Sequence, residues 1–262
     1  MKRLNLTASL TLLLLSAACW LAPGLVRADV TFETKVNGST QTAYVAAHKF
    51  AASSDEGNAI FRGDKQVLWV LNPKDKTYTE MTEADVQAMG SKMGQAMAQM
   101  QEALKNVPAE QRAMVEKMMK GKMPAASEVQ RTVKPMGVSK SINGFECNGY
   151  QVSRSDGQSL EVWAADPKSV KLNPDDLTVF KEFSDFIGPM VPQTSGIQEM
   201  IKDYAHPKDS DVPGIPILTI QKDKDGKETL RAEVLKIDQG TVDPAQFEVP
   251  SGFARQAAPG EK

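Results

Sequence analysis

The run VLWVL, from Val67 to Leu71, constrains the fold more than any other part of the chain. Every position in it is apolar, whereas a strand with one face in water alternates apolar and polar residues. A turn at Asn72-Pro73 follows, and the next residues, Thr77 to Thr79, are the β-branched and aromatic types that suit a strand. The pattern predicts a strand that other parts of the protein cover on both faces.

Short runs of strand length surround this segment. Turn signals such as Asn37-Gly38 and Asp225-Gly226 separate them, at spacings typical of antiparallel hairpins. We therefore expect one curved antiparallel sheet. Its expected strands are VTFETKV, QTAYVAA, NAIFRG, QVLWVL, KTYTEM, EVQRTVKPM, GYQVSRS, SLEVWAA, GIPILTIQ and ETLRAEVLKI.

Residues 82–123 interrupt the strands with a helical pattern. Thr82 and Asp85 have the spacing of a capping box, and Gly121 can close a second helix. At 100° per residue, one face of the first helix carries four methionines. We expect this face to cover the concave side of the sheet. The four residues, called the methionine face below, are Met89, Met93, Met97 and Met100.

Three interpretations of the methionine face are open. It packs on the sheet as an ordinary core; or it lines a site for an apolar ligand, since unbranched methionine adapts to varied shapes; or its thioethers bind Cu(I), a soft ion. Regular helical spacing is what packing alone produces. A second helical stretch is expected from Pro174 to Ile187.

The N-terminus has the parts of a secretory signal peptide. A basic start at Met1 to Arg3 precedes an apolar run from Leu10 to Ala22, and Val26 to Ala28 provides small residues for cleavage before Asp29. An uncleaved anchor and a lipoprotein modified at Cys19 are the alternatives. We expect a periplasmic or secreted protein, with a signal peptide (1–28), one β domain (29–253) containing the insert 82–123, and a disordered tail (254–262).

The charge of the mature chain limits the classes of partner to expect, and its cysteine content limits its disulfides. Cleavage removes three of the 31 basic residues and leaves 28 against 33 acidic residues, a formal charge of −5. Nucleic acid is therefore not an expected partner, because phosphate binding requires a basic face. The mature chain keeps one cysteine, Cys147, which cannot form an internal disulfide and is expected to be a small buried residue.

No enzyme is predicted. The two histidines, His48 and His206, have neither metal-ligand spacing nor a nucleophile partner. The segment Asp223 to Gly226 lacks the closing carboxylate of a calcium loop and is expected to be a hairpin turn. Asp175-Asp176 fits a helix start. We expect no catalytic residues, no metal site and no cofactor.

Four segments of the chain resemble an uncharacterised bacterial family of exported proteins, one of the domain-of-unknown-function families. They are FRGDKQVLWVLNPKDKTYTEM, INGFECNGYQV, LEVWAAD and GIPILTIQKDKDGKETLRAEVLKI with FEVPSGF. The resemblance covers most of Val30 to Phe253. That family is in turn similar to the LolA-like lipoprotein-carrier fold, an incomplete β-barrel with a helical lid over an apolar cavity. It brings no catalytic residues to this chain.

Together these features predict an α+β fold, a curved antiparallel sheet covered by helices from the methionine-rich insert. The expected function is non-catalytic binding or carriage of an apolar small molecule or lipid, or of a lipidated chain, with an envelope protein as a possible partner. The alternative is an envelope copper-binding protein. Trp163 is a candidate interior residue. The expected ligand contacts are Met89, Met93, Met97, Met100, Trp69, Val67 and Leu71.

Overall fold

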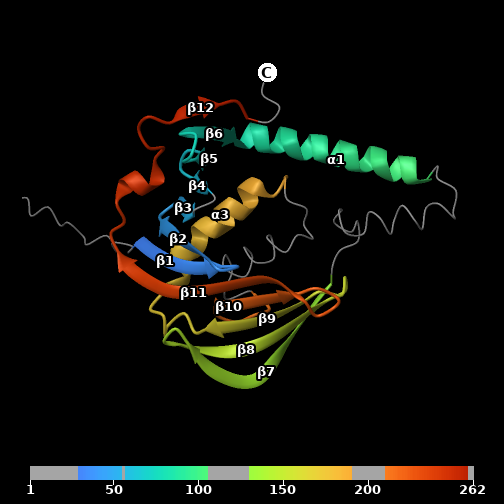
Figure 1. The fold of residues 1–262 in the computed structure, drawn as a ribbon, viewed down its shortest axis with the longest axis vertical. Helices are drawn as coiled ribbons and strands as arrows, with labels where there is room; N and C mark the ends of the chain where they lie inside the picture. The colour runs from blue at the N-terminus through green and yellow to red at the C-terminus, as the bar shows by residue number, and fades with distance from the viewer. Residues whose placement is uncertain (1–28, 55–56, 106–129, 191–209, 259–262) are drawn as a thin grey trace, which may run out of the picture.

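The computed structural model describes residues 29–54, 57–105, 130–190 and 210–258. These residues form a 12-stranded curved sheet with two α-helices on its concave side (Figure 1). The strands are β1 (Asp29–Val36), β2 (Ser39–Ala46), β3 (Lys49–Ser54), β4 (Gly57–Arg62), β5 (Val67–Asn72), β6 (Thr77–Thr82), β7 (Arg131–Ile142), β8 (Phe145–Arg154), β9 (Ser159–Ala165), β10 (Ile215–Lys222), β11 (Glu228–Gly240) and β12 (Ala254–Gln256). The helices are α1 (Glu83–Lys105) and α3 (Thr178–Ile187), with the 3-10 turns η1 (Pro174–Leu177) and η2 (Pro244–Phe247).

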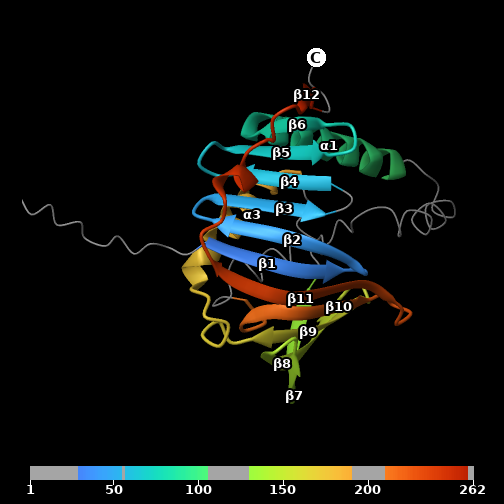
Figure 2. The ribbon, with the colours of Figure 1, turned by 60° about the vertical axis from the view of Figure 1, so that its left-hand side comes forward.

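The strand order is β12-β6-β5-β4-β3-β2-β1-β11-β10-β9-β8-β7 (Figure 2). All neighbouring strands are antiparallel except β12, which runs parallel to β6. Because β12 and β7 lie at opposite ends of this order, the sheet is unclosed. The predicted curved antiparallel sheet is therefore confirmed at the level of a mostly-sheet, open-barrel-like architecture.

Local sequence explains the hairpins. Asn37 and Gly38 join β1 to β2 with φ of 49° and 95°, the positive values that a tight hairpin turn requires. The predicted turn at Asp223 to Gly226 is also observed, because the Asp223 carboxylate accepts hydrogen bonds from the backbone N–H groups of Asp225 and Lys227, both at 2.9 Å. It links β10 to β11 as a hairpin, which was the expectation.

Both helical segments begin as the sequence predicts. Thr82 and Asp85 form the capping box at the start of α1, with the Thr82 backbone N–H donating to Asp85 Oδ2 at 2.9 Å and the Asp85 N–H donating to Thr82 Oγ1 at 3.3 Å. Asn173 caps η1 in the same reciprocal way with Asp176. The expected helical stretch at 174–187 is thus observed as η1 followed by α3. Residues 106–123 of the expected insert lie outside the described residues, as does the expected signal peptide at 1–28.

Two strands were not predicted. The first is β3, which lies between β2 and β4. The second is β12, which occupies residues 254–256 where a disordered tail was expected; its Ala254 N–H donates to Lys76 O at 2.9 Å. Pairing with β6 supplies hydrogen bonds that the short, polar β12 sequence does not predict by itself.

The expected cover of the concave side by the methionine-rich insert stays a prediction, because residues 106–123 of the insert lie outside the described residues. Helix α3 packs on the concave side of the sheet. Its apolar face packs against the main core, with Val179, Phe186 and Ile187 buried. By contrast, α1 joins that core through Val86, which is fully buried, and extends away from the sheet beyond it (Figure 1). Within the described residues, no helix combines the length and apolar character needed to cross a membrane.

Candidate binding site

Strand β5 has the two covered faces that its sequence predicts. Leu68 belongs to the main core on the α3 side. Val67, Trp69 and Leu71 point to the convex side, where they form a second cluster with residues that follow β11. That segment, Val242 to Phe253, contains η2 and runs over the convex side of the sheet (Figure 2). The C-terminal part of the chain therefore closes the face that the sequence left without a cover.

A buried arginine fastens this C-terminal segment. Arg62, only 5% exposed, donates two hydrogen bonds to the Asp64 carboxylate, both at 2.7 Å, and pairs with Glu248. The hydrogen bonds from Arg62 lower the pKa of Asp64. Burial raises the pKa of Glu248, but hydrogen bonds from Lys65 and Arg62 outweigh it, so that this pKa is lowered. Both carboxyls are therefore charged at neutral pH, where each forms an ion pair with the Arg62 guanidinium.

An aromatic cluster attaches α3 to the concave side. Phe50 of β3 lies 5.2 Å from Phe180 and 5.8 Å from Phe183, measured between ring centroids. Phe61 of β4 lies 5.4 Å from Phe183 and 5.3 Å from Phe186. Edge-on and tilted pairs at these distances stabilise packing beyond the area they bury. This cluster packs α3 against strands β3 and β4.

Beyond the aromatic cluster, the next line of residues across the sheet is not buried. Strand pairing aligns these residues, called the cross-strand row below, on one face of the sheet. Val70 in this row is 43% exposed, although Leu68, two residues earlier on the same strand, is 6% exposed. The row consists of Ala43, Ala52, Ala59, Val70 and Thr79.

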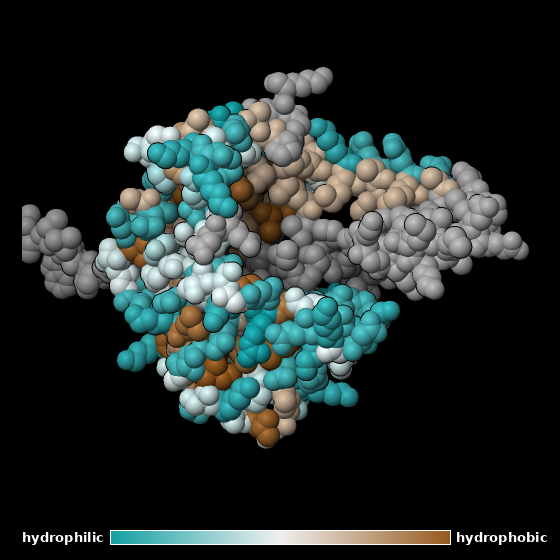
Figure 3. All heavy atoms as spheres, in the orientation of Figure 1, coloured by the Kyte–Doolittle hydropathy of each residue, from teal (hydrophilic) through white to brown (hydrophobic). Residues whose placement is uncertain are grey.

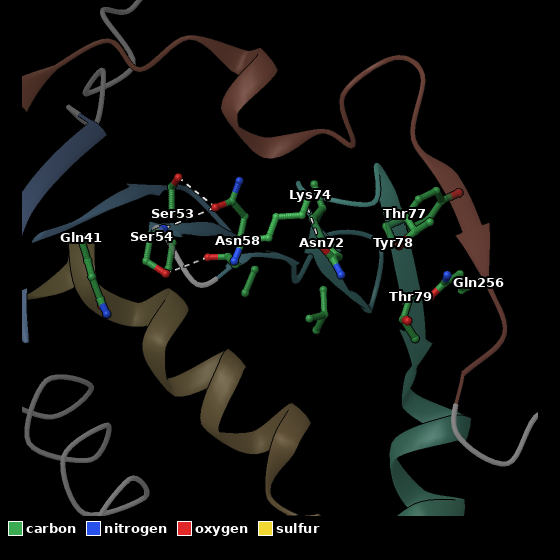
Figure 4. Close-up of a pocket in the computed structure, with 15 residues that line it drawn as sticks. Gln41, Ser53, Ser54, Asn58, Asn72, Lys74, Thr77, Tyr78, Thr79 and Gln256 are labelled. Carbon is green, nitrogen blue, oxygen red and sulfur yellow. Dashed lines mark hydrogen bonds between the residues drawn. The ribbon is translucent and has the colours of Figure 1, made fainter. Parts of the chain in front are cut away.

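The cross-strand row runs through two pockets. The outer pocket has a volume of about 600 Å³ and contains Ala52, Ala59, Val70 and Thr79, with polar residues around them (Figure 4). The inner pocket, of about 190 Å³, contains Ala43 and is walled mainly by apolar side chains. Those apolar walls are Phe32, Val36, Phe50, Phe180 and Val234. Gln41 lines both pockets, so they adjoin each other on the α3 side.

The methionine face lies on α1 and is partly open. Met93 is 45% exposed, and Met89, Met97 and Met100 are half-buried. In Figure 3, the side of α1 that turns toward the rest of the molecule is tan and its outer side is teal. At Gly90 the helix approaches the end of α3 so closely that a Cβ atom there would lie 2.4 Å from the Pro189 carbonyl oxygen.

The structure does not bring the expected ligand contacts together. Val67, Trp69 and Leu71 are packed under the C-terminal segment on the convex side, whereas the methionine face belongs to a helix that joins the core on the concave side. Trp69 donates its indole N–H to Glu80 Oε2 at 2.8 Å, as a core tryptophan does. Sequence reasoning missed the cross-strand row, whose small residues give no strong signal. The missed strand β3 supplies Ala52.

The other residues that the sequence analysis singled out are packed in the fold or paired with a neighbouring side chain. Cys147 is 1% exposed, as expected, and burial raises the pKa of its thiol to about 11. His48 lies in the β2–β3 turn, where Nδ1 is 2.7 Å from Glu182 Oε1 of α3. Trp163 is buried, as expected, and Lys140 Nζ lies 3.7 Å from its ring centroid. In the described ranges, no group of three or more His, Cys, Asp or Glu could hold a metal ion. His206 lies outside those ranges.

Several solved structures are similar to this chain at low identity, and no curated protein matches it. An uncharacterized conserved protein from Thermus thermophilus is 6% identical over 89% of this chain and 92% of that one, with a TM-score of 0.43. MucB is 8% identical over 86% of this chain, with a TM-score of 0.40, and the chain spans 58% of MucB. The MucA/MucB complex of Pseudomonas aeruginosa gives 10% identity over 84% of this chain and 55% of that one, with a TM-score of 0.38.

A family match covers most of the chain. The profile of DUF4412, a domain of unknown function, matches residues 62–253. These limits include the Arg62 pair, the whole of α3 and the C-terminal segment that closes the convex side. The predicted membership of a domain-of-unknown-function family is confirmed: this chain belongs to the DUF4412 family.

Proposed function

We propose that this protein is an exported, non-catalytic binding or carrier protein for an apolar ligand, such as a lipid or a lipidated chain. The observation that carries the proposal is the inner pocket, a concave space of about 190 Å³ walled by apolar side chains between α3 and strands β1 and β11. Small-molecule sites are typically concave and mostly apolar. The exposed Val70 extends the apolar surface into the outer pocket.

The methionine face is the second part of the proposed site. Partly exposed methionines on one helix offer an adaptable apolar surface to a ligand. Val67, Trp69 and Leu71 have no place in the proposal, because they pack against the C-terminal segment on the other side of the sheet.

The proposal places the mature protein in the periplasm or outside the cell, with an N-terminus at Asp29. A carrier has to pass on its ligand, so an envelope protein is included as the proposed partner. N-terminal sequencing of the exported form tests the location. An intact Met1 or a lipidated Cys19 contradicts it.

Binding is tested with N-phenyl-1-naphthylamine, an uncharged apolar dye that fluoresces when it leaves water. We expect saturable binding by the parent protein and weaker binding by Ala43→Phe, which fills the inner pocket. Thr40→Phe is the matched control, since it adds the same ring to an exposed position on the opposite face of β2. Equal binding by parent and Ala43→Phe would place the ligand elsewhere, and absence of binding by the folded parent rejects the function.

The methionine face is tested separately with Met93→Lys. Because Met93 is 45% exposed, the lysine variant is expected to fold. We expect weaker dye binding in Met93→Lys than in Gln95→Lys, which adds the same charge at another exposed position of α1. If the two variants bind equally, the methionine face takes no part in the site.

A further inference from the structure

The two adjoining pockets differ in chemistry. The inner pocket is walled by phenylalanine and valine side chains. The outer pocket combines the small floor of the cross-strand row with hydroxyl and amide side chains from several strands. These polar residues are Gln41, Ser53, Ser54, Asn58, Asn72, Thr77, Thr79 and Gln256. An apolar space next to a polar, uncharged one suits a molecule that has the same two parts.

Among the described residues that line the combined pockets, two carry a charge, Lys74 at the outer pocket and Glu233 at the inner pocket. Lys74 lies in the exposed β5–β6 turn. Glu233 accepts a hydrogen bond from Asn143 Nδ2 at 2.9 Å. Among the described lining residues of the outer pocket, a cationic group finds no opposite charge and an anionic group finds only Lys74, whereas an uncharged hydrogen-bonding group finds amide and hydroxyl partners from several strands.

Several polar side chains of the outer pocket are available to a ligand, among them Gln41, Thr79 and Gln256. Within the described part of the chain, no hydrogen bond engages the side-chain amides of Gln41 and Gln256 or the hydroxyl of Thr79. Thr79 and Gln256 are paired across β6 and β12 and lie next to each other (Figure 4). Gln41 lies where the two pockets meet. Amide and hydroxyl groups both donate and accept hydrogen bonds, so they match an uncharged head rich in hydroxyls or amides.

We propose that the ligand is an amphiphile with an uncharged, hydrogen-bonding head and a hydrocarbon chain. The chain lies in the inner pocket beside Phe180, passes Gln41, and the head lies over the cross-strand row between Val70 and Gln256. This inference rests on the proposed function, because it assigns the class of ligand to the same site. It adds the head chemistry and the direction in which the molecule lies.

Three surfactants with the same chain test the proposal by calorimetry below their micelle concentrations. They are dodecyl maltoside, which is neutral and rich in hydroxyls, dodecanoate and dodecyltrimethylammonium. We expect dodecyl maltoside to bind at least about tenfold more tightly than dodecyltrimethylammonium, which finds no carboxylate among the described residues of the outer pocket. It should also bind more tightly than dodecanoate, whose only charged partner there is the exposed Lys74. An ionic surfactant that binds as tightly overturns the proposed head chemistry and leaves apolar binding intact. If none of the three binds, the proposed function fails as well.

Two variants locate the head and the chain. The double change Gln41→Met and Thr79→Val removes polar groups of similar size and should reduce the preference for dodecyl maltoside. Thr42→Val, next to Gln41 on the opposite face of β2, is the matched control and should keep it. Ala43→Phe should weaken the binding of all three surfactants to a similar degree. If the double variant keeps the full preference for the neutral head, the head does not lie over the cross-strand row.

Discussion

The two sides of the sheet at β5 differ in how far they are closed. On the convex side, Val67, Trp69 and Leu71 are at most 8% exposed under the C-terminal segment. On the concave side, Leu68 is 6% exposed and Val70 is 43% exposed. Among the described residues, the C-terminal segment covers Val67, Trp69 and Leu71 on the convex side, whereas the aromatic contacts of α3 on the concave side reach Phe50 and Phe61. The two sides of β5 therefore differ in exposure at Val70.

The difference shows what an all-apolar strand does and does not predict. The VLWVL run predicted covers on both faces, and both exist. It did not predict that Val70 would be 43% exposed, because valine is as apolar as the buried residues beside it. Exposure at Val70 depends on which distant segments pack over it, and α3, which packs on the same side of the sheet, is far away in the chain. A site of this kind is visible only once the two segments are placed together.

The largest expected effect is a difference in stability loss between a variant on the convex side and a variant on the concave side. Phe247 of η2 is 2% exposed in the convex cluster, so Phe247→Ala should lower the free energy of unfolding by about 3–5 kcal/mol. Val70→Ala on the open side should cost less than about 1 kcal/mol, since its side chain is 43% exposed. Chemical denaturation of both variants measures the contrast. Similar losses would mean that the two sides are equally closed.

The next effect depends on pH. The lowered pKa values of Asp64 and Glu248 mean that their stabilising contribution is present above the ordinary carboxyl range, near pH 4, and is lost as the pH falls through the lowered values. Arg62→Met should remove this contribution. Because both carboxylates remain partly exposed, the loss at neutral pH should be about 1.5–3 kcal/mol, less than for a fully buried pair.

Denaturation of the parent and of Arg62→Met between pH 7 and pH 3 measures this effect. The difference between the two proteins should shrink as the pH falls. A constant difference across that range would show that Arg62 stabilises the C-terminal segment through packing alone.

The sequence predicted most strands because alternation and turn residues are local signals. It missed β3, whose Ala51, Ala52 and Ser53 have low strand propensity and are held by pairing with β2 and β4. It missed β12 because that strand pairs with β6, far away in the chain. Periodicity correctly gave α1 an apolar face but could not say what that face contacts. For the same reason, the sequence did not predict that α3 packs on the concave side.

Two glycine-to-alanine substitutions on α1 test its contact with α3. Gly90→Ala places a Cβ atom 2.4 Å from the Pro189 carbonyl oxygen, so the helix must shift. We expect a net loss of about 1–2 kcal/mol, although alanine favours the helix by roughly 1 kcal/mol. Gly94→Ala, one turn later with nothing within 4 Å, should stabilise the protein by up to about 1 kcal/mol. Thermal unfolding of both variants decides whether α1 is fixed at Gly90, and equal shifts would contradict that contact.

The smallest effects are expected from Leu at Met89, Met93, Met97 and Met100. Leucine keeps a similar volume and apolar character while it removes sulfur, and these positions are at most half-buried, so each change should alter stability by less than about 1 kcal/mol. Dye binding should persist in the fourfold variant, because an apolar lining does not require sulfur. Titration of Cu(I) against a competing chelator provides the second measurement. Tight copper binding by the parent that disappears in the leucine variant would assign the methionine face to a metal, and the open surface on the concave side would then serve a different ligand from the one proposed.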